Sequence, residues 1–198
     1  MVKGLFAWMT ILILAFAQSA QSQQQPKPTN IRNAGSFSCS DFLPVVNSPG
    51  RELEKTAFLQ WAAGYSAAAA KSNSLIDLFP IGDTWELIAM TAFVCQENQE
   101  VNFEAALRTA LGRLRPYWIR EDPAILTLND PSGRVVQFYA EATAQLQRDL
   151  RHFGTGVTVD GVYGNQTGNA ILRLNQNRGS TPYLTPDGEF LYQLTLPR

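Results

Sequence analysis

Three segments in the first half of the chain place apolar residues three and four positions apart, the spacing of one face of an α-helix. The first covers residues 51–71 and is rich in alanine, which favours helix. The second covers residues 83–95, and either Asp83 or Thr84 can cap its start. The third covers residues 102–114 and is followed by a proline that stops it. The pattern predicts three helices in this half.

The last third of the chain returns to helical spacing. Apolar residues recur at that spacing over residues 139–153, a glycine-punctuated loop follows, and a second helical pattern begins near Ala170. Residues 117–133 contain Pro123 and Pro131, directly follow Pro116, and have no sustained helical pattern. We therefore interpret them as a linker. We predict an all-α fold with two helical domains, residues 38–116 and residues 134–198.

The linker leaves two local structures open. Residues 125–128 favour a β-strand, and the turn-forming residues after them allow pairing with residues 135–138 as a small hairpin. The alternative is that a helix starts at Pro131, since proline is common in the first turn of a helix.

The N-terminus has the pattern of an export signal. Lys3 precedes an apolar run over residues 5–17, and small residues of the kind that a signal peptidase accepts come next. The run is too short to cross a hydrocarbon core, which needs about 20 residues. We therefore predict a signal peptide over residues 1–22, a disordered Gln- and Pro-rich leader over residues 23–37, and no membrane span after the signal is removed.

Charge and cysteine content agree with an exported protein. The net charge of −1 argues against a nucleic-acid partner. Residues 39–130 carry seven basic and twelve acidic residues, a net charge of −5, whereas residues 131–198 carry six and five, a net charge of +1. In an oxidising compartment the two cysteines, Cys39 and Cys95, are expected to form one disulfide. We predict a periplasmic or secreted location.

A run of specific residues marks the C-terminal pattern: Leu146-Gln147 on the first helix, Gly154 at its end, the loop motif Asp160-Gly161-x-x-Gly164-x-x-Thr167, and Ala170-Ile171 on the second helix. This pattern resembles the three-helix peptidoglycan-binding domain that anchors many bacterial envelope proteins to the cell wall. The resemblance implies a small helical bundle and peptidoglycan as the partner. Three positions depart from the family pattern: Asn165 replaces a proline, Leu174-Asn175 replaces Phe-Gln, and Phe190 replaces threonine.

The loop motif has two possible roles, holding the loop and touching ligand. Gly161 and Gly164 permit backbone angles that side chains disfavour, and Asp160 can accept hydrogen bonds from loop amides. Either Asn165 or Thr167 can cap the next helix. A wall-binding groove also needs aromatic rings and hydrogen-bond donors. Our candidate ligand-binding residues are Asp160, Gly161, Tyr163, Gly164, Thr167, Arg173, Asn177 and Tyr183.

In the first half, Cys39 stands before an aromatic-rich helix, and Cys95-Gln96-Glu97-Asn98 stands before an amphipathic helix containing Phe103. On these residues, the segment 38–115 resembles the small periplasmic HdeA/HdeB-type proteins, in which a cysteine pair pins a helical core. It implies a disulfide-pinned helical domain. Acid-activated chaperone activity does not follow from these residues.

The residue inventory argues against catalysis. A zinc hydrolase needs two or three histidines, and the single histidine, His152, is better interpreted as a helix-end residue. A Cys–His nucleophile needs a free thiol, whereas Cys95 is assigned to the disulfide. We expect no metal and no cofactor. The leading hypothesis is a non-enzymatic envelope protein that binds peptidoglycan; the alternatives are a periplasmic chaperone-like or protein-interaction factor that binds an envelope protein, and an accessory to a wall hydrolase.

Overall fold

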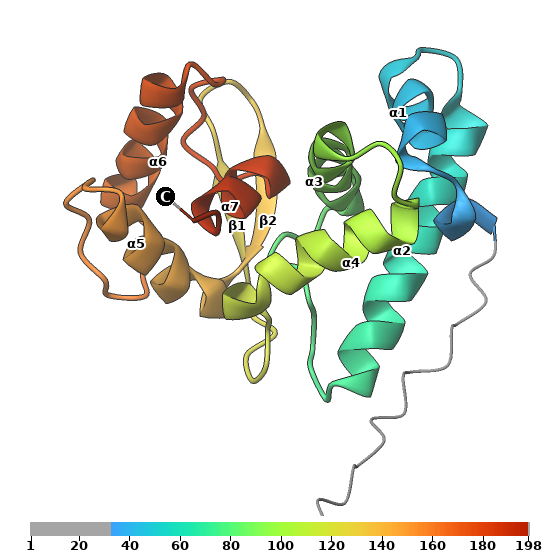
Figure 1. Cartoon of the computed structure of the whole chain (residues 1–198). Coiled ribbons are helices and arrows are strands. Elements are labelled where there is room, and N and C mark those ends of the chain that lie inside the picture. The colour runs from blue at the N-terminus through green and yellow to red at the C-terminus, as the bar shows by residue number, and fades with distance from the viewer. Residues whose placement is uncertain (1–32, 198) are drawn as a thin grey trace, which may run out of the picture. The chain divides into compact units, whose positions relative to one another are not determined.

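The computed structural model describes residues 33–197, which belong to one compact unit (Figure 1). The predicted signal peptide, and the predicted leader up to residue 32, lie outside the described residues. The first half contains four α-helices: α1 (Cys39–Asn47), α2 (Glu52–Ser72), α3 (Thr84–Glu97) and α4 (Phe103–Arg113). The second half contains β1 (Ile125–Asn129), β2 (Val135–Tyr139), α5 (Thr143–His152), α6 (Asn165–Arg178) and α7 (Gly188–Leu194).

The three helices that the spacing predicts are present as α2, α3 and α4. Side-chain caps begin two of them: the Asp83 carboxylate accepts from the Trp85 amide, and the Asn102 side chain accepts from the Ala105 amide. Asp83, not Thr84, is therefore the cap of α3. An additional helix, α1, begins with Ser38 as its cap.

Aromatic rings and the disulfide hold these helices together. Phe42 of α1, Phe58 of α2 and Phe103 of α4 are buried, and their ring centroids lie 4.6–5.0 Å apart. The predicted disulfide joins Cys39 at the start of α1 to Cys95 near the end of α3. Because both cysteines are fully buried, the bond lies inside this aromatic core.

The end of the predicted leader is ordered against this core. Asn33–Ser36 form a short 3₁₀ helix in which Ala34 and Gly35 are buried. A Cβ atom at Gly35 would lie 2.2 Å from the Trp61 ring, so only glycine allows the backbone to approach the indole this closely. The leader prediction therefore extended too far at its C-terminal end.

The fold is mostly helical but not purely all-α, because residues 125–139 form an antiparallel hairpin. The pairing runs from Ile125 opposite Tyr139 to Asn129 opposite Val135. Alternate residues bury one face of the hairpin, with Leu128, Val136 and Phe138 in the core. The sequence allowed either a hairpin or a helix starting at Pro131, and the hairpin is the structure observed. Its burial alternates with a period of two residues, as in a β-strand.

Glycines end the first two C-terminal helices, the first of them at the predicted Gly154, and an aspartate caps the third. Gly154 follows α5 with φ +77° and Gly179 ends α6 with φ +69°, left-handed conformations that favour glycine. The Asp187 carboxylate caps α7 by accepting from the Phe190 amide at 2.7 Å. Figure 1 shows α5, α6 and α7 grouped beside the hairpin.

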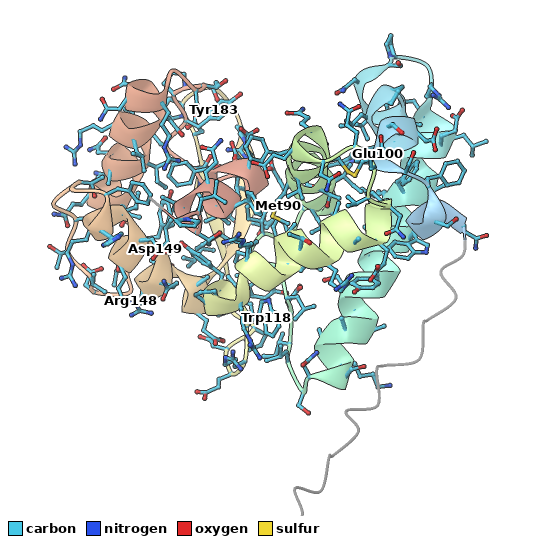
Figure 2. All side chains as sticks on the ribbon, in the orientation of Figure 1. Met90, Glu100, Trp118, Arg148, Asp149 and Tyr183 are labelled. Atoms are coloured by element: carbon cyan, nitrogen blue, oxygen red, sulfur yellow. A yellow bond between two sulfur atoms is a disulfide. The ribbon has the colours of Figure 1, made fainter. Side chains whose placement is uncertain are left out.

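Helix α3 of the first half contacts α7 of the second. One Glu86 oxygen accepts from Arg134 at 2.7 Å and the other from the Gly188 amide at 3.0 Å. A Cβ at Gly188 would lie 2.3 Å from the Glu86 carbonyl and 3.0 Å from Met90, labelled on α3 in Figure 2. The two predicted domains, residues 38–116 and 134–198, thus share buried contacts. The division between them at the linker stays a prediction.

Candidate functional site

Gln147 of α5 organises the loop motif. Its side-chain carbonyl accepts from the amides of Asp160 at 3.0 Å and Gly161 at 2.8 Å. Its side-chain amide donates to the Asp160 carboxylate at 2.7 Å, the Val162 carbonyl at 3.0 Å and the Thr167 hydroxyl at 3.2 Å. Because Gln147 is only 1% exposed, this network connects the buried face of α5 to the surface loop.

The motif residues divide between the two roles proposed from the sequence. Asp160 and Gly161 (φ +74°) hold the loop. Gly164 was expected to need a special backbone angle, which is wrong: its φ of −135° is extended backbone with open space around it. The capping prediction is also wrong. Helix α6 has no side-chain cap, because Asn165 is already its first residue and the buried Thr167 hydroxyl faces Gln147.

The loop hydrogen bonds stabilise the charged form of Asp160. The Val162 amide and then the Gln147 side chain donate to its carboxylate and hold its pKa below the ordinary value of 3.8. A lowered pKa in the folded state means that the interaction contributes stability above pH 3.8, and that this contribution is lost as the pH falls through the folded-state pKa.

We therefore expect Asp160 to titrate below pH 3.8 in the native protein, followed by NMR of its carboxyl carbon. In a Gln147→Leu variant one of the two main donors is gone, and the pKa should move up towards 3.8. A native value at or above 3.8 would contradict the interpretation of Asp160 as the anion that holds this loop.

A cavity of about 340 Å³ lies where the loop meets α6 and the hairpin. None of the described residues in its lining is charged, and several present amide or hydroxyl groups. The predicted candidates Tyr163 and Gly164 are among them. The lining residues are Thr127, Leu128, Asn129, Tyr163, Gly164, Asn165, Gly168, Asn169, Leu184 and Thr185.

Strand β1 adds main-chain groups to this cavity. At one end of the hairpin the Asp130 amide donates to the Arg134 carbonyl, and at the other the Ala140 amide donates to the Ala124 carbonyl. In an antiparallel pair the hydrogen-bonded positions alternate, so the even-numbered residues of β1 direct their main-chain hydrogen bonds to β2. The amide and carbonyl groups of Thr127 and Asn129 therefore point away from β2. Within the described residues, none of these groups has a backbone partner outside the strands.

Tyr163 forms one wall of the cavity and is held in place. Its hydroxyl donates to the Leu184 carbonyl at 2.7 Å, and its ring lies 6.2 Å from that of Phe138. Burial raises the pKa of Tyr163, so the hydroxyl stays protonated and remains a donor at neutral pH. The ring is a fixed apolar surface beside neutral polar groups.

Tyr183 lines a different cavity, of about 310 Å³, in the α6–α7 connection (Figure 2). One side of its ring is occupied by the Arg134 guanidinium, 4.8 Å from the ring centroid. This cavity also contains Asp187 and Glu189. Burial raises the pKa of Asp187, and the charge of Glu86 adds to that effect. Tyr183 therefore belongs to the contact between α3 and α7.

The other two candidates lie outside both cavities. Arg173 is exposed on α6 and donates to the Thr155 carbonyl at 3.0 Å. Asn177 is exposed on the same helix. The structure thus brings together Tyr163 and Gly164 with residues that the sequence did not single out, chiefly Thr127, Asn129 and Asn169. The strand residues come from about 35 positions earlier, and no local signal connects them to the loop.

Residues 33–197 contain no group of three His, Cys, Asp or Glu side chains placed to hold a metal ion. In the same range no helix has the length and apolar character that crossing a bilayer requires. Comparisons with models of known protein families, with characterised proteins and with solved structures found no match.

Proposed function

We propose that this chain is an exported, non-enzymatic cell-envelope protein that binds peptidoglycan at the cavity beside Tyr163. The observation that carries the proposal is the lining of that cavity, which combines a fixed aromatic ring with neutral amide and hydroxyl groups. The resemblance of the Asp160–Thr167 loop to wall-binding domains supports the same partner.

The chemistry of the lining favours a neutral, highly hydroxylated ligand. The glycan of peptidoglycan presents hydroxyl and N-acetyl groups, which pair with amide side chains such as Asn165 and Asn169 and with the outward main-chain groups of Thr127. A phosphate or a metal ion would need charged partners, and the lining residues that the structure describes include none. The Tyr163 ring provides an apolar surface for a sugar face.

Export is supported by independent features. Residues 5–17 form an apolar run with small residues after it, which is typical of a signal peptide. The Cys39–Cys95 disulfide is a bond that persists in oxidising compartments such as the periplasm.

The test is co-sedimentation of the protein with purified peptidoglycan sacculi. Asn169→Ala removes an exposed amide from the cavity and is expected to weaken binding about tenfold, since a lost hydrogen bond costs roughly 1.5 kcal/mol. Asn177→Ala, on the same helix but outside the cavity, is the matched control and should bind normally. Point variants are preferable to deleting the C-terminal region, because α3 packs on α7.

Two outcomes would contradict the proposal. Absence of sedimentation with sacculi would remove peptidoglycan as the partner. Equal loss in the Asn169→Ala and Asn177→Ala variants would place the contact elsewhere on α6. Circular dichroism and the melting temperature of both variants confirm that the comparison concerns binding and not folding.

A second candidate function, a periplasmic protein-interaction factor, is favoured by the free edge of β1. This five-residue strand contains no charged residue, and Ile125 on it is 49% exposed. Such an edge can accept an extended peptide as a further strand. Protection of an aggregating client protein, without sedimentation on sacculi, would favour this function over wall binding.

A further inference from the structure

A second region with the character of a binding site lies between α2, α3 and the hairpin, where a cavity of about 340 Å³ opens. It shares no residue with the cavity beside Tyr163 and plays no part in the proposed function. Helix α2 supplies one wall, the segment before α3 a second, and the hairpin a third. The lining residues are Ala63, Ser66, Ala67, Ala70, Ile76, Asp77, Phe79, Ile81, Gly82, Thr84, Leu87, Ile125 and Tyr139.

Most of the residues in this lining are apolar. Three residues of α2 in the lining are alanines, and their small side chains leave space that larger side chains would fill. Ile76 is 41% exposed and Ile125 is 49% exposed, so apolar surface that faces water continues from the cavity. An aliphatic chain that covered these side chains would remove this surface from water.

Among the described residues that line the cavity, Asp77 is the only charged one and no basic side chain is present. Its two oxygens accept from the Phe79 amide at 3.0 Å and from the Tyr139 hydroxyl at 3.2 Å. Burial raises the pKa of Asp77 although these hydrogen bonds oppose the change, which reflects a carboxylate that lacks a positive partner. A carboxylate can accept more than two hydrogen bonds, so a cationic donor can still be added.

Ser66 provides an independent indication of a ligand. It is only 7% exposed, and it lines the cavity from the middle of α2. Helical Ser72 and Thr56 donate to the carbonyl four residues earlier, but no hydrogen bond of the Ser66 hydroxyl is found among the described residues. The Ser66 hydroxyl therefore has hydrogen-bonding capacity left over at the cavity, and a polar group of a ligand there would use it.

We propose that this cavity binds a small aliphatic amine. The ammonium group pairs with Asp77, the Ser66 hydroxyl provides a further hydrogen bond, and the alkyl chain lies against the alanines of α2. The charge of the lining selects a cation over an anion, and its apolar walls select an alkyl chain over a hydrated metal ion. The inference does not rest on the proposed function.

The experiment is an NMR titration of the ¹⁵N-labelled protein with n-hexylammonium, n-hexanol and hexanoate. We expect n-hexylammonium to shift the amides of the lining and to bind at least tenfold more tightly than either of the others. In Asp77→Asn, which keeps the shape of the side chain, this preference for the ammonium compound should disappear. Failure of n-hexylammonium to bind, or equal binding of hexanoate, would overturn the proposal.

A matched pair of variants tests the position independently of charge. Ala67→Leu places a larger side chain into the cavity and should abolish n-hexylammonium binding, whereas Ala68→Leu, the next exposed alanine of α2, should leave it unchanged. Unaltered binding by Ala67→Leu would overturn the proposed location. Both substitutions keep an apolar side chain of high helix propensity, and circular dichroism checks that α2 persists.

The same titration separates two sources of the amine. A soluble muropeptide with a free side-chain amine is added in place of n-hexylammonium. Shifts of the same lining amides would assign the amine to the diamino acid of the cell wall, and binding of n-hexylammonium alone would assign it to a free small molecule. The effect of Asn169→Ala on sacculus binding is measured in the co-sedimentation assay and not in this titration. Failure of either proposal is therefore distinguishable from failure of the other.

Discussion

Replacing both cysteines with alanine is expected to lower the free energy of unfolding by about 4 kcal/mol. The disulfide connects residues 56 positions apart, so it removes much of the freedom of the unfolded chain. Both cysteines are fully buried beside the aromatic rings of Phe42 and Phe103 in the core of the first half. Urea unfolding monitored by tryptophan fluorescence measures the change directly.

The control for this prediction is chemical reduction. Dithiothreitol should destabilise the native protein by a similar amount and leave the double alanine variant unchanged. A difference below about 1 kcal/mol between oxidised and reduced protein would contradict the prediction, because it would mean that the bond constrains little of the unfolded chain.

Replacing Gln147 with leucine is expected to destabilise the protein by about 3 kcal/mol. Leucine is close to glutamine in size and suits the buried position, but it forms none of the five hydrogen bonds that connect α5 to the loop. Water can replace the partner of the exposed Asp160. It reaches the Thr167 hydroxyl poorly, because Thr167 is only 1% exposed. The loss should appear in urea unfolding and as faster hydrogen exchange of the Gly161 and Val162 amides.

Gln176→Leu provides the matched control. Gln176 is exposed on α6 and takes no part in the loop network, so its replacement should change stability by less than about 0.5 kcal/mol. If Gln147→Leu proved equally mild, the loop would be held by its own turn geometry and not by α5. If wall binding is as proposed, Gln147→Leu should also weaken sacculus binding, since Tyr163 and Gly164 belong to the same loop and line the cavity.

Local signals were sufficient to predict most helices. Residues 51–71 and 83–95 have apolar positions at helical spacing, and α2 and α3 occupy nearly the same ranges. Gly154 marks a helix end because it adopts the left-handed backbone angle there, and Asp187 marks a helix start because its side chain accepts from a free amide of the first turn. These features depend only on neighbours along the chain.

Local signals could not predict the pairing of β1 with β2 or the contact of β2 with the segment before α3. Residues 125–128 favour a strand, but pairing depends on burial of Leu128 and Phe138 against helices that are distant in sequence. The outer edge of β2 is paired with the segment before α3, where the Gly82 amide donates to the Gln137 carbonyl. Contacts of this range leave no periodicity in the sequence.

The candidate site shows the same division. The loop motif identified Asp160 and Gly161 because their roles follow from turn chemistry. Arg173 and Asn177 lie on one helix but outside the cavity. Thr127 and Asn129 line the cavity, and only the packing of the hairpin beside α6 puts them there.

By itself the sequence determined α2, α3 and α4 and the glycine turns at Gly154 and Gly161, because each of these depends on spacing or on chemistry within a few residues. It also determined the cysteine pair, because the chain contains only two cysteines. The tertiary structure alone decided which polar groups share a cavity, how β1 pairs, and that Glu86 joins α3 to α7. The physical reason is that burial and hydrogen bonding between distant segments depend on how the helices and strands pack in three dimensions.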